Sequence, residues 1–166
     1  MTKLTDPLVE ELVPEIVFML AAGYDTAGNT LGFLFWQLFQ HPVVFDRLVM
    51  DVTSQFSATG PTITLAEITD RLPYVEAVVY ETMRCYPSLP SRLPRIIKGP
   101  ARSYHGYYFP TNTLIHTPIY SVHRNSVVWS HPNTFDPDRF LGPEGEKRKR
   151  DVHGFNIGPH HCIGRR

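Results

Sequence analysis

Phe155-Asn-Ile-Gly158-Pro-His160-His-Cys162-Ile-Gly164-Arg-Arg166 ends the chain and holds one cysteine in a loop between two glycines. Gly158 lies four residues before Cys162 and Gly164 two residues after it. Glycine permits backbone conformations that a Cβ would exclude. Such a loop leaves room for a flat, bulky cofactor to lie against the main chain. The stretch therefore predicts a cofactor-binding loop built around Cys162.

Two other interpretations of Cys162 are open at this point. Cysteine is often a small buried hydrophobe, and two cysteines in 166 residues indicate neither a disulfide framework nor a Cys-rich zinc module. A zinc site could still join Cys162 to nearby histidines, namely His131, His153, His160 and His161. Their spacings fit none of the usual zinc patterns, Cys-x₂₋₄-Cys or His-x₃₋₅-His. Zinc is therefore the less favoured metal.

The loop resembles the Phe-x-x-Gly-x-Arg-x-Cys-x-Gly signature of the cytochromes P-450. Phe155, Gly158, Cys162 and Gly164 match it, and His160 stands where arginine is usual. The resemblance implies a haem b cofactor (iron protoporphyrin IX) with Cys162 as the proximal iron ligand, a thiolate that favours O–O cleavage. It also implies that His160 holds a haem propionate, because imidazole can donate the same hydrogen bond, with a charge that depends on pH.

Further residues take roles from this resemblance. The amides of Ile163 and Gly164 are expected to donate hydrogen bonds to the thiolate and so tune the potential of the iron. Arg95, or with less weight Arg92, is expected to bind the second propionate. The stretch 88–94 would line the substrate pocket together with part of the long helix described next, and its apolar residues suggest an apolar organic substrate.

A long helix is predicted over 8–40, in which the run of 24 residues from Ile16 to Phe39 has Asp25 as its only charge. At 100° per residue, several residues of this run fall within about 140° of one another and form a polar stripe. The members of the stripe are Ala22, Asp25, Thr26, Asn29 and Thr30. A polar stripe on an otherwise apolar helix indicates a wet or reactive neighbour.

Ala22-Gly23-Tyr24-Asp25-Thr26 in this helix is similar to the oxygen-activation motif of the same family. The resemblance implies that Asp25 and Thr26 relay protons for the activation of dioxygen. Ala22 and Gly23 would let the haem approach the helix closely, and a local widening of the helix would free backbone groups to hold water. The alternative is a membrane span, which is disfavoured because an Asp near mid-span costs roughly 2.5–3.5 kcal/mol.

Glu81-Thr-Met-Arg84 is a Glu-x-x-Arg motif within a helix predicted over 73–86. Residues three apart face the same side of a helix, so the two charged side chains can pair. Phe135-Asp-Pro-Asp-Arg139-Phe140 resembles the family segment whose arginine joins this pair. The resemblance implies a buried structural triad of Glu81, Arg84 and Arg139 that clamps the chain leading to the cysteine. Loss of one partner would cost roughly 3–5 kcal/mol.

The predicted fold class is mainly α with small β-sheets (α+β), one partial domain over 1–166 that corresponds to the incomplete C-terminal part of the P-450 fold. Besides the two helices above, the expected elements are helices 42–55 and 64–70, strands 91–97, 107–109 and 113–116, a meander 117–153 and the haem loop 154–166. Thr64 and Glu67 are expected to form a capping box. The charged run 144–151 is expected to be a solvated loop, because acids flank its basic residues.

The resemblance implies a haem-thiolate monooxygenase that inserts one atom of dioxygen into an apolar substrate and reduces the other to water. No Gly-x-Gly-x-x-Gly fingerprint is present, so electrons are expected from an NADPH-dependent flavoprotein reductase. Zero formal net charge and the lack of a basic stripe argue against nucleic acid as a partner. Details of the haem loop suggest a microsomal parent on the cytosolic face of the endoplasmic reticulum membrane. Its membrane anchor is expected outside this chain, which shows no targeting segment.

Two alternative functions are open. A family member that isomerises or dehydrates an oxygenated substrate would use the same thiolate without a proton relay, and the Asp25-Thr26 pair disfavours it. The resemblance covers only the C-terminal third to two-fifths of a typical member. The other alternative is therefore a truncated, non-catalytic product that exposes apolar surface and aggregates.

Overall fold

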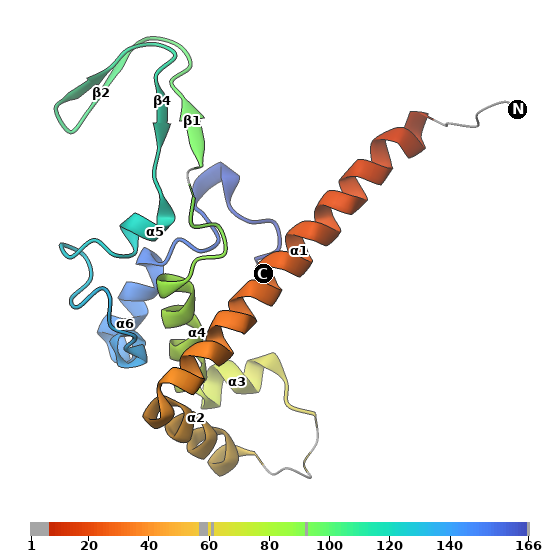
Figure 1. The fold of residues 1–166 in the computed structure, drawn as a ribbon, viewed down its shortest axis with the longest axis vertical. Helices are drawn as coiled ribbons and strands as arrows, with labels where there is room; N and C mark the ends of the chain where they lie inside the picture. The colour runs from red at the N-terminus through yellow and green to blue at the C-terminus, as the bar shows by residue number, and fades with distance from the viewer. Residues whose placement is uncertain (1–6, 57–59, 61, 92, 166) are drawn as a thin grey trace, which may run out of the picture.

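The computed structural model describes residues 7–56, 60, 62–91 and 93–165, and it is mainly helical with two small antiparallel sheets (Figure 1). The helices are α1 (Pro7–Gln40), α2 (Pro42–Gln55), α3 (Leu65–Arg71), α4 (Pro73–Cys85), α5 (Ile119–Val122) and α6 (Gly142–Arg148), with 3₁₀ helices η1 (Pro137–Phe140), η2 (Lys149–Asp151) and η3 (Gly158–His160). Strand β1 (Pro94–Ile96) pairs with β4 (Leu114–His116), and β2 (Arg102–Tyr104) pairs with β3 (Tyr107–Phe109). The predicted fold class is confirmed.

The helix starts follow from local chemistry. α2 and α4 each begin at a proline, Pro42 and Pro73, whose missing N–H and fixed φ suit the first helical position. At α3, the Thr64 N–H donates to the Glu67 carboxylate at 2.9 Å and the Glu67 N–H donates to the Thr64 hydroxyl at 3.3 Å, so the predicted capping box is confirmed. The ends of α1, α2, α3 and α4 all lie within one residue of the ends expected from the sequence.

Several expected elements differ from the structure, and strand β1 covers only Pro94–Ile96 of the strand expected over 91–97. Strand β2 was not predicted, and the prediction of a solvated loop over 144–151 is wrong, because α6 and η2 cover it. The Lys149 ammonium donates to the Glu76 carboxylate of α4 at 2.7 Å, which docks this segment on the core. A Cβ at Gly145 would lie 2.1 Å from the carbonyl carbon of Phe140, so glycine is needed for α6 to pack against η1.

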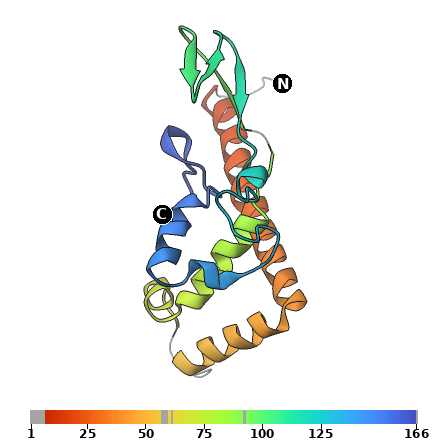
Figure 2. The same ribbon diagram turned by 90° about the vertical axis from the view of Figure 1, so that its left-hand side faces the viewer.

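Helix α1 is the longest element, and its N-terminal half leads away from the rest of the chain (Figures 1 and 2). Pro14 lies inside this helix. The large apolar side chains exposed on this half are Val9, Leu12, Val13, Ile16, Val17, Phe18, Met19, Leu20 and Tyr24. The C-terminal half differs, since Gln37 and Leu38 are buried where α1 meets α2 and α4.

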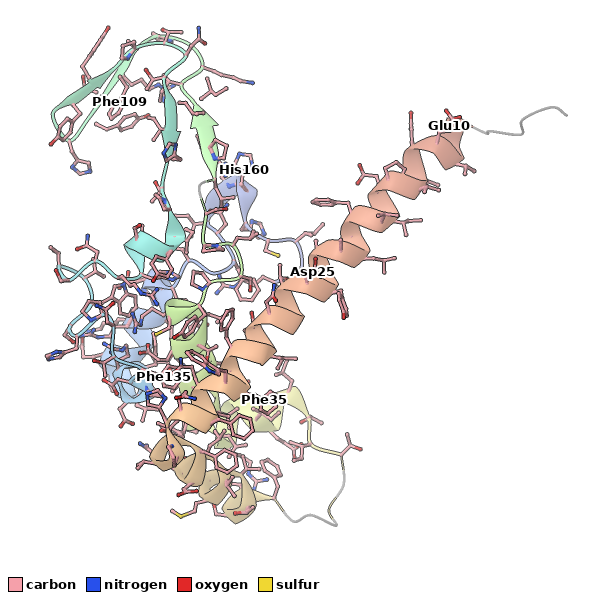
Figure 3. All side chains as sticks on the ribbon, viewed as in Figure 1. Glu10, Asp25, Phe35, Phe109, Phe135 and His160 are labelled. Carbon is pink, nitrogen blue, oxygen red and sulfur yellow. The ribbon has the colours of Figure 1, made fainter. Side chains whose placement is uncertain are left out.

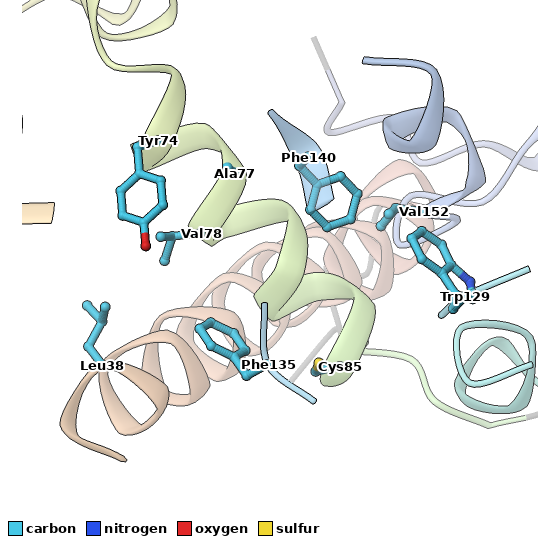
Figure 4. Close-up of a cluster of buried hydrophobic side chains, with 9 residues drawn as sticks. All are labelled: Leu38, Tyr74, Ala77, Val78, Cys85, Trp129, Phe135, Phe140 and Val152. Carbon is cyan, nitrogen blue, oxygen red and sulfur yellow. The ribbon is translucent and has the colours of Figure 1, made fainter. Parts of the chain in front are cut away.

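The hydrophobic core surrounds α4, which lies between α1 and the segment that follows α5 (Figure 4). The buried cluster consists of Leu38, Tyr74, Ala77, Val78, Cys85, Trp129, Phe135, Phe140 and Val152. Four of these nine residues belong to α4, and four come from the chain between α5 and the cysteine loop. This packing holds the charged face of α4 against the chain that leads to Cys162.

Candidate active site

A buried cluster of charge joins α4 to η1. The Nε of Arg84 donates to Oε2 of Glu81 at 2.7 Å and its Nη2 donates to Oε1 at 2.8 Å, a bidentate pair with both side chains fully buried. Arg139 reaches the same carboxylate, with its Nε 3.1 Å from Oε1. Bidentate arginine–carboxylate pairing is among the stronger protein hydrogen-bonding arrangements. The structure thus brings Glu81, Arg84 and Arg139 into direct contact.

Arg84 uses its remaining donors on the chain beyond β4. The acceptors on that chain are the carbonyl oxygens of His123 (2.9 Å), Pro132 (2.8 Å) and Thr134 (3.2 Å). The sulfur of Cys85, within α4, also accepts from Arg84 (3.0 Å). Burial opposes the charge on Arg84, but the hydrogen bonds and charge of Glu81 outweigh burial and raise the pKa of Arg84. The guanidinium therefore stays protonated and pins three separate carbonyls to α4.

His123 connects this charge cluster to the start of the cysteine loop. Its imidazole is fully buried, with Nδ1 3.1 Å from the carbonyl oxygen of Arg84. The Nε2 atom accepts the backbone N–H of His153 at 2.9 Å. A carbonyl on one side and an N–H donor on the other select the neutral tautomer with the proton on Nδ1. The chain from Arg84 through His123 to His153 thus reaches within two residues of Phe155.

The buried position of His123 predicts that acid destabilises this region. Burial lowers the pKa of His123 from 6.5 to about 4. Below pH 6.5 the unfolded chain binds a proton on this imidazole that the folded chain does not bind until the pH approaches 4. The free energy of unfolding is therefore highest above pH 6.5 and decreases as the pH falls toward 4. The expected loss is about 3 kcal/mol. Urea unfolding across this range measures it, and His123→Gln, which has no ionisable ring, should reduce the slope; an unchanged slope contradicts the assignment.

The cysteine loop is held by its own backbone. The Cys162 N–H donates to the Phe155 carbonyl at 2.8 Å and the Arg165 N–H donates to the Cys162 carbonyl at 3.3 Å. Gly158 has φ +69°, a conformation that favours glycine, and a Cβ at Gly164 would lie 3.6 Å from the Cys162 sulfur. The thiol is exposed. Within the described chain, no hydrogen bond reaches this sulfur from the amides of Ile163 or Gly164.

Asp25 and Thr26 lie midway along α1, an element separate from the η3 segment that carries His160 (Figure 3). The Thr26 hydroxyl donates to the Ala22 carbonyl at 2.6 Å. Asp25 is exposed, and a Cβ added at Gly23 would meet nothing within 4 Å, so the space beside this turn is open. Among the described residues, no hydrogen bond or ion pair joins this turn to the cysteine loop.

Arg95 lies on β1 and shares a pocket of about 280 Å³ with the approach to the cysteine loop. The polar side chains that line this pocket are Arg95, His116, Thr117, His153 and Asn156. The Nη1 of Arg95 donates to the carbonyl of the adjacent Pro94 at 2.9 Å, and the Arg95 side chain is otherwise exposed. Arg92, the alternative partner for a propionate, lies outside the described residues.

The chain matches the family model described as Cytochrome P-450 over residues 2–166. The chain belongs to the cytochrome P-450 family. The cytochrome P-450 monooxygenase sol6 of Alternaria solani is 34% identical over 97% of this chain and 35% of its own length. Cytochrome P-450 3A29 of Sus scrofa is 32% identical over 95% of this chain and 31% of its own length. The chain thus spans about a third of the length of the curated relatives it matches.

The P-450 family implies a haem cofactor, and the residues present fit one. An exposed thiol lies beside exposed apolar side chains, Phe155, Ile157 and Ile163, a surface suited to a flat apolar ring.

In the part of the chain that the structure describes, no group of three or more His, Cys, Asp or Glu could hold a metal ion, so the zinc interpretation has no ligand set there. None of the described helices is long and apolar enough to cross a membrane.

Two P-450 site features were missed by sequence reasoning. No role was predicted for His123, because its burial and its contacts with Arg84 and His153 depend on the tertiary structure. Ser88 is expected in the wall of the substrate pocket, and no contact with α1 was predicted for its hydroxyl, which lies close to Thr26 and Thr30. The polar stripe on α1 required a polar neighbour, and the hydroxyl just after the Glu-x-x-Arg helix was the available signal.

Proposed function

We propose that this chain is the catalytic C-terminal part of a haem-thiolate monooxygenase. The reaction inserts one atom of dioxygen into an apolar organic substrate and reduces the other to water, with two electrons and two protons. The observation that carries the proposal is the exposed Cys162 in a loop whose approach is fixed to the buried Glu81–Arg84–Arg139 cluster through His123. Sequence similarity to proteins named cytochrome P-450 monooxygenases supports it.

Haem b bound at Cys162 would supply the dioxygen chemistry. Phe155, Gly158, Ile163 and Gly164 would shape the loop against the ring, and His160 and Arg95 would donate hydrogen bonds to the two propionates. Ala22 and Gly23 would face the ring from α1, where the open space beside Gly23 admits a cofactor.

Asp25 and Thr26 would deliver the protons. The Asp25 carboxylate is exposed and can take protons from water, and the Thr26 hydroxyl lies one residue away on the same turn. Thr26 Oγ1 keeps its proton directed at the Ala22 carbonyl in the resting arrangement. Delivery requires this proton to turn from that carbonyl toward the reacting oxygen and to be replaced from Asp25.

Electrons would come from an NADPH-dependent flavoprotein reductase. Details of the haem loop favour a full-length parent on the cytosolic face of the endoplasmic reticulum membrane, and the relatives include both fungal and mammalian cytochrome P-450 proteins. The membrane attachment would lie outside these residues.

Replacing Thr26 by alanine tests the proton-delivery role in the haem-loaded protein. The thiolate band of the reduced carbon monoxide complex should remain, because Thr26 does not hold the haem. Product formed per NADPH oxidised should fall by about tenfold or more, because a positioned acid–base group typically contributes roughly 10²–10⁴-fold to the rate. Equal coupling in Thr26→Ala and wild type would show that Thr26 delivers no proton.

A further inference from the structure

A hydroxyl pair connects the oxygen-activation turn of α1 to the segment after α4. The Ser88 Oγ lies 3.0 Å from the Thr26 carbonyl oxygen and 2.8 Å from the Thr30 Oγ1. The Thr30 Oγ1 lies 2.9 Å from the same Thr26 carbonyl. Ser88 and Thr26 are 62 residues apart in sequence, so this contact exists only because the two elements pack together.

The proton count limits how these three contacts are shared. Thr30 and Ser88 each carry one hydroxyl proton, so two of the three contacts are hydrogen bonds at a time. Both hydroxyls donate to the Thr26 carbonyl, or one donates to the other and the second donates to the carbonyl. In every arrangement the Thr26 carbonyl accepts a hydroxyl in addition to its place in the helical ladder.

An added donor on a helix carbonyl changes the helix locally. Hydroxyl groups that bond back to the ladder, or that enter it from another element, are known causes of helix bending. On this face of α1 two successive turns are affected, since Thr26 donates to the Ala22 carbonyl and its own carbonyl accepts from Thr30 or Ser88. Thr26 is therefore held both at its side chain and at its backbone.

The segment that carries Ser88 is itself fixed. Pro87 is buried, and the Tyr86 ring stacks on Phe33 of α1 with centroids 4.6 Å apart. The Tyr86 hydroxyl accepts a hydrogen bond from the Gln37 amide at 2.8 Å. These contacts place Ser88 against α1 four residues beyond Arg84. The position of the Thr26 turn is thereby tied to the buried charge cluster of α4.

We propose that Thr30 and Ser88 are positioning residues that hold the Thr26 carbonyl and so fix the Asp25–Thr26 turn for proton delivery. Neither hydroxyl needs to touch the haem or substrate for this role. The inference rests on the monooxygenase function proposed above. It adds a specific claim, namely that the coupling of reductant to product depends on a hydroxyl contributed from outside α1.

The test uses Ser88→Ala and Thr30→Val, singly and together, in the haem-loaded protein. Each single change should lower product formed per NADPH by roughly fivefold, the factor that one hydrogen bond of typical strength gives. The double variant should lose little more than either single variant, because each single change already removes the Thr30–Ser88 contact through which the two hydroxyls act as a pair. Ser88→Thr and Thr30→Ser, which keep a hydroxyl, should recover most of the coupling.

Thr53→Val is the matched control. Its hydroxyl donates to the Val49 carbonyl at 2.8 Å within α2, so it has the same back-bonding geometry, with acceptors in its own helix only. This change should leave coupling at the wild-type value. The thiolate band and the unfolding midpoint should stay unchanged in all variants, which separates positioning from loss of fold.

The outcomes separate the two proposals. A wild-type protein that forms no thiolate band or product overturns the monooxygenase function and this inference with it. A functional wild type in which Ser88→Ala and Thr30→Val couple normally overturns the inference alone. A loss of coupling that Ser88→Thr fails to recover, or that follows a matching loss of the thiolate band, also overturns it, because the hydroxyl would then serve only packing.

Discussion

Glu81→Ala is expected to destabilise the protein by roughly 3–5 kcal/mol, the cost of leaving buried charge without its partner. The carboxylate of Glu81 is fully buried and accepts from both Arg84 and Arg139, while the Asp136 N–H also donates to it. Alanine would leave two guanidinium groups inside the protein with carbonyl oxygens as their main acceptors. Because those carbonyls belong to the chain leading to Cys162, the haem loop should lose its position as well.

The free energy of unfolding in urea measures this effect. Glu144→Ala is the matched control, since Glu144 also pairs with a cation three residues away, Lys147, but both side chains are about three-quarters exposed. An exposed pair contributes about 0.5 kcal/mol or less. Similar small losses for Glu81→Ala and Glu144→Ala would mean that water or a rearranged neighbour replaces the buried carboxylate.

Cys162→Ser is expected to abolish the red-shifted thiolate band of the reduced carbon monoxide complex, together with product formation. Serine keeps the size of the side chain but does not supply a thiolate, and the electron donation that favours O–O cleavage depends on sulfur. The backbone bonds of the loop, such as Cys162 N–H to the Phe155 carbonyl, do not involve the side chain. The fold should therefore persist while the spectrum changes.

Cys85→Ser is the control for this substitution. The Cys85 thiol is buried in the core, and burial raises its pKa to about 11, so it stays protonated at neutral pH. It accepts a hydrogen bond from Arg84, a contact that a serine oxygen can also make. The thiolate band should survive in Cys85→Ser. A band retained in Cys162→Ser would reject Cys162 as the iron ligand.

Several parts of the fold were predictable because they depend on neighbours in sequence. Proline at the first position of α2 and α4 and the Thr64–Glu67 box of α3 act within a single turn of helix. The charged run 144–151 was harder, because its composition suits a solvated loop. Its helix depends on Lys149 finding Glu76, 73 residues away, and on Gly145 meeting the backbone of Phe140.

By itself, the sequence indicated the family and the order of its motifs, and the resemblance to that family predicted which residues bind haem or move protons. The tertiary structure alone decided which atoms meet. It set the three carbonyls on Arg84, the tautomer of His123 and the partners of Ser88. A hydrogen bond requires heavy atoms about 3 Å apart in the correct direction. Spacing along the chain does not specify this for groups 30 to 62 residues apart, whose separation is fixed when the core around α4 packs.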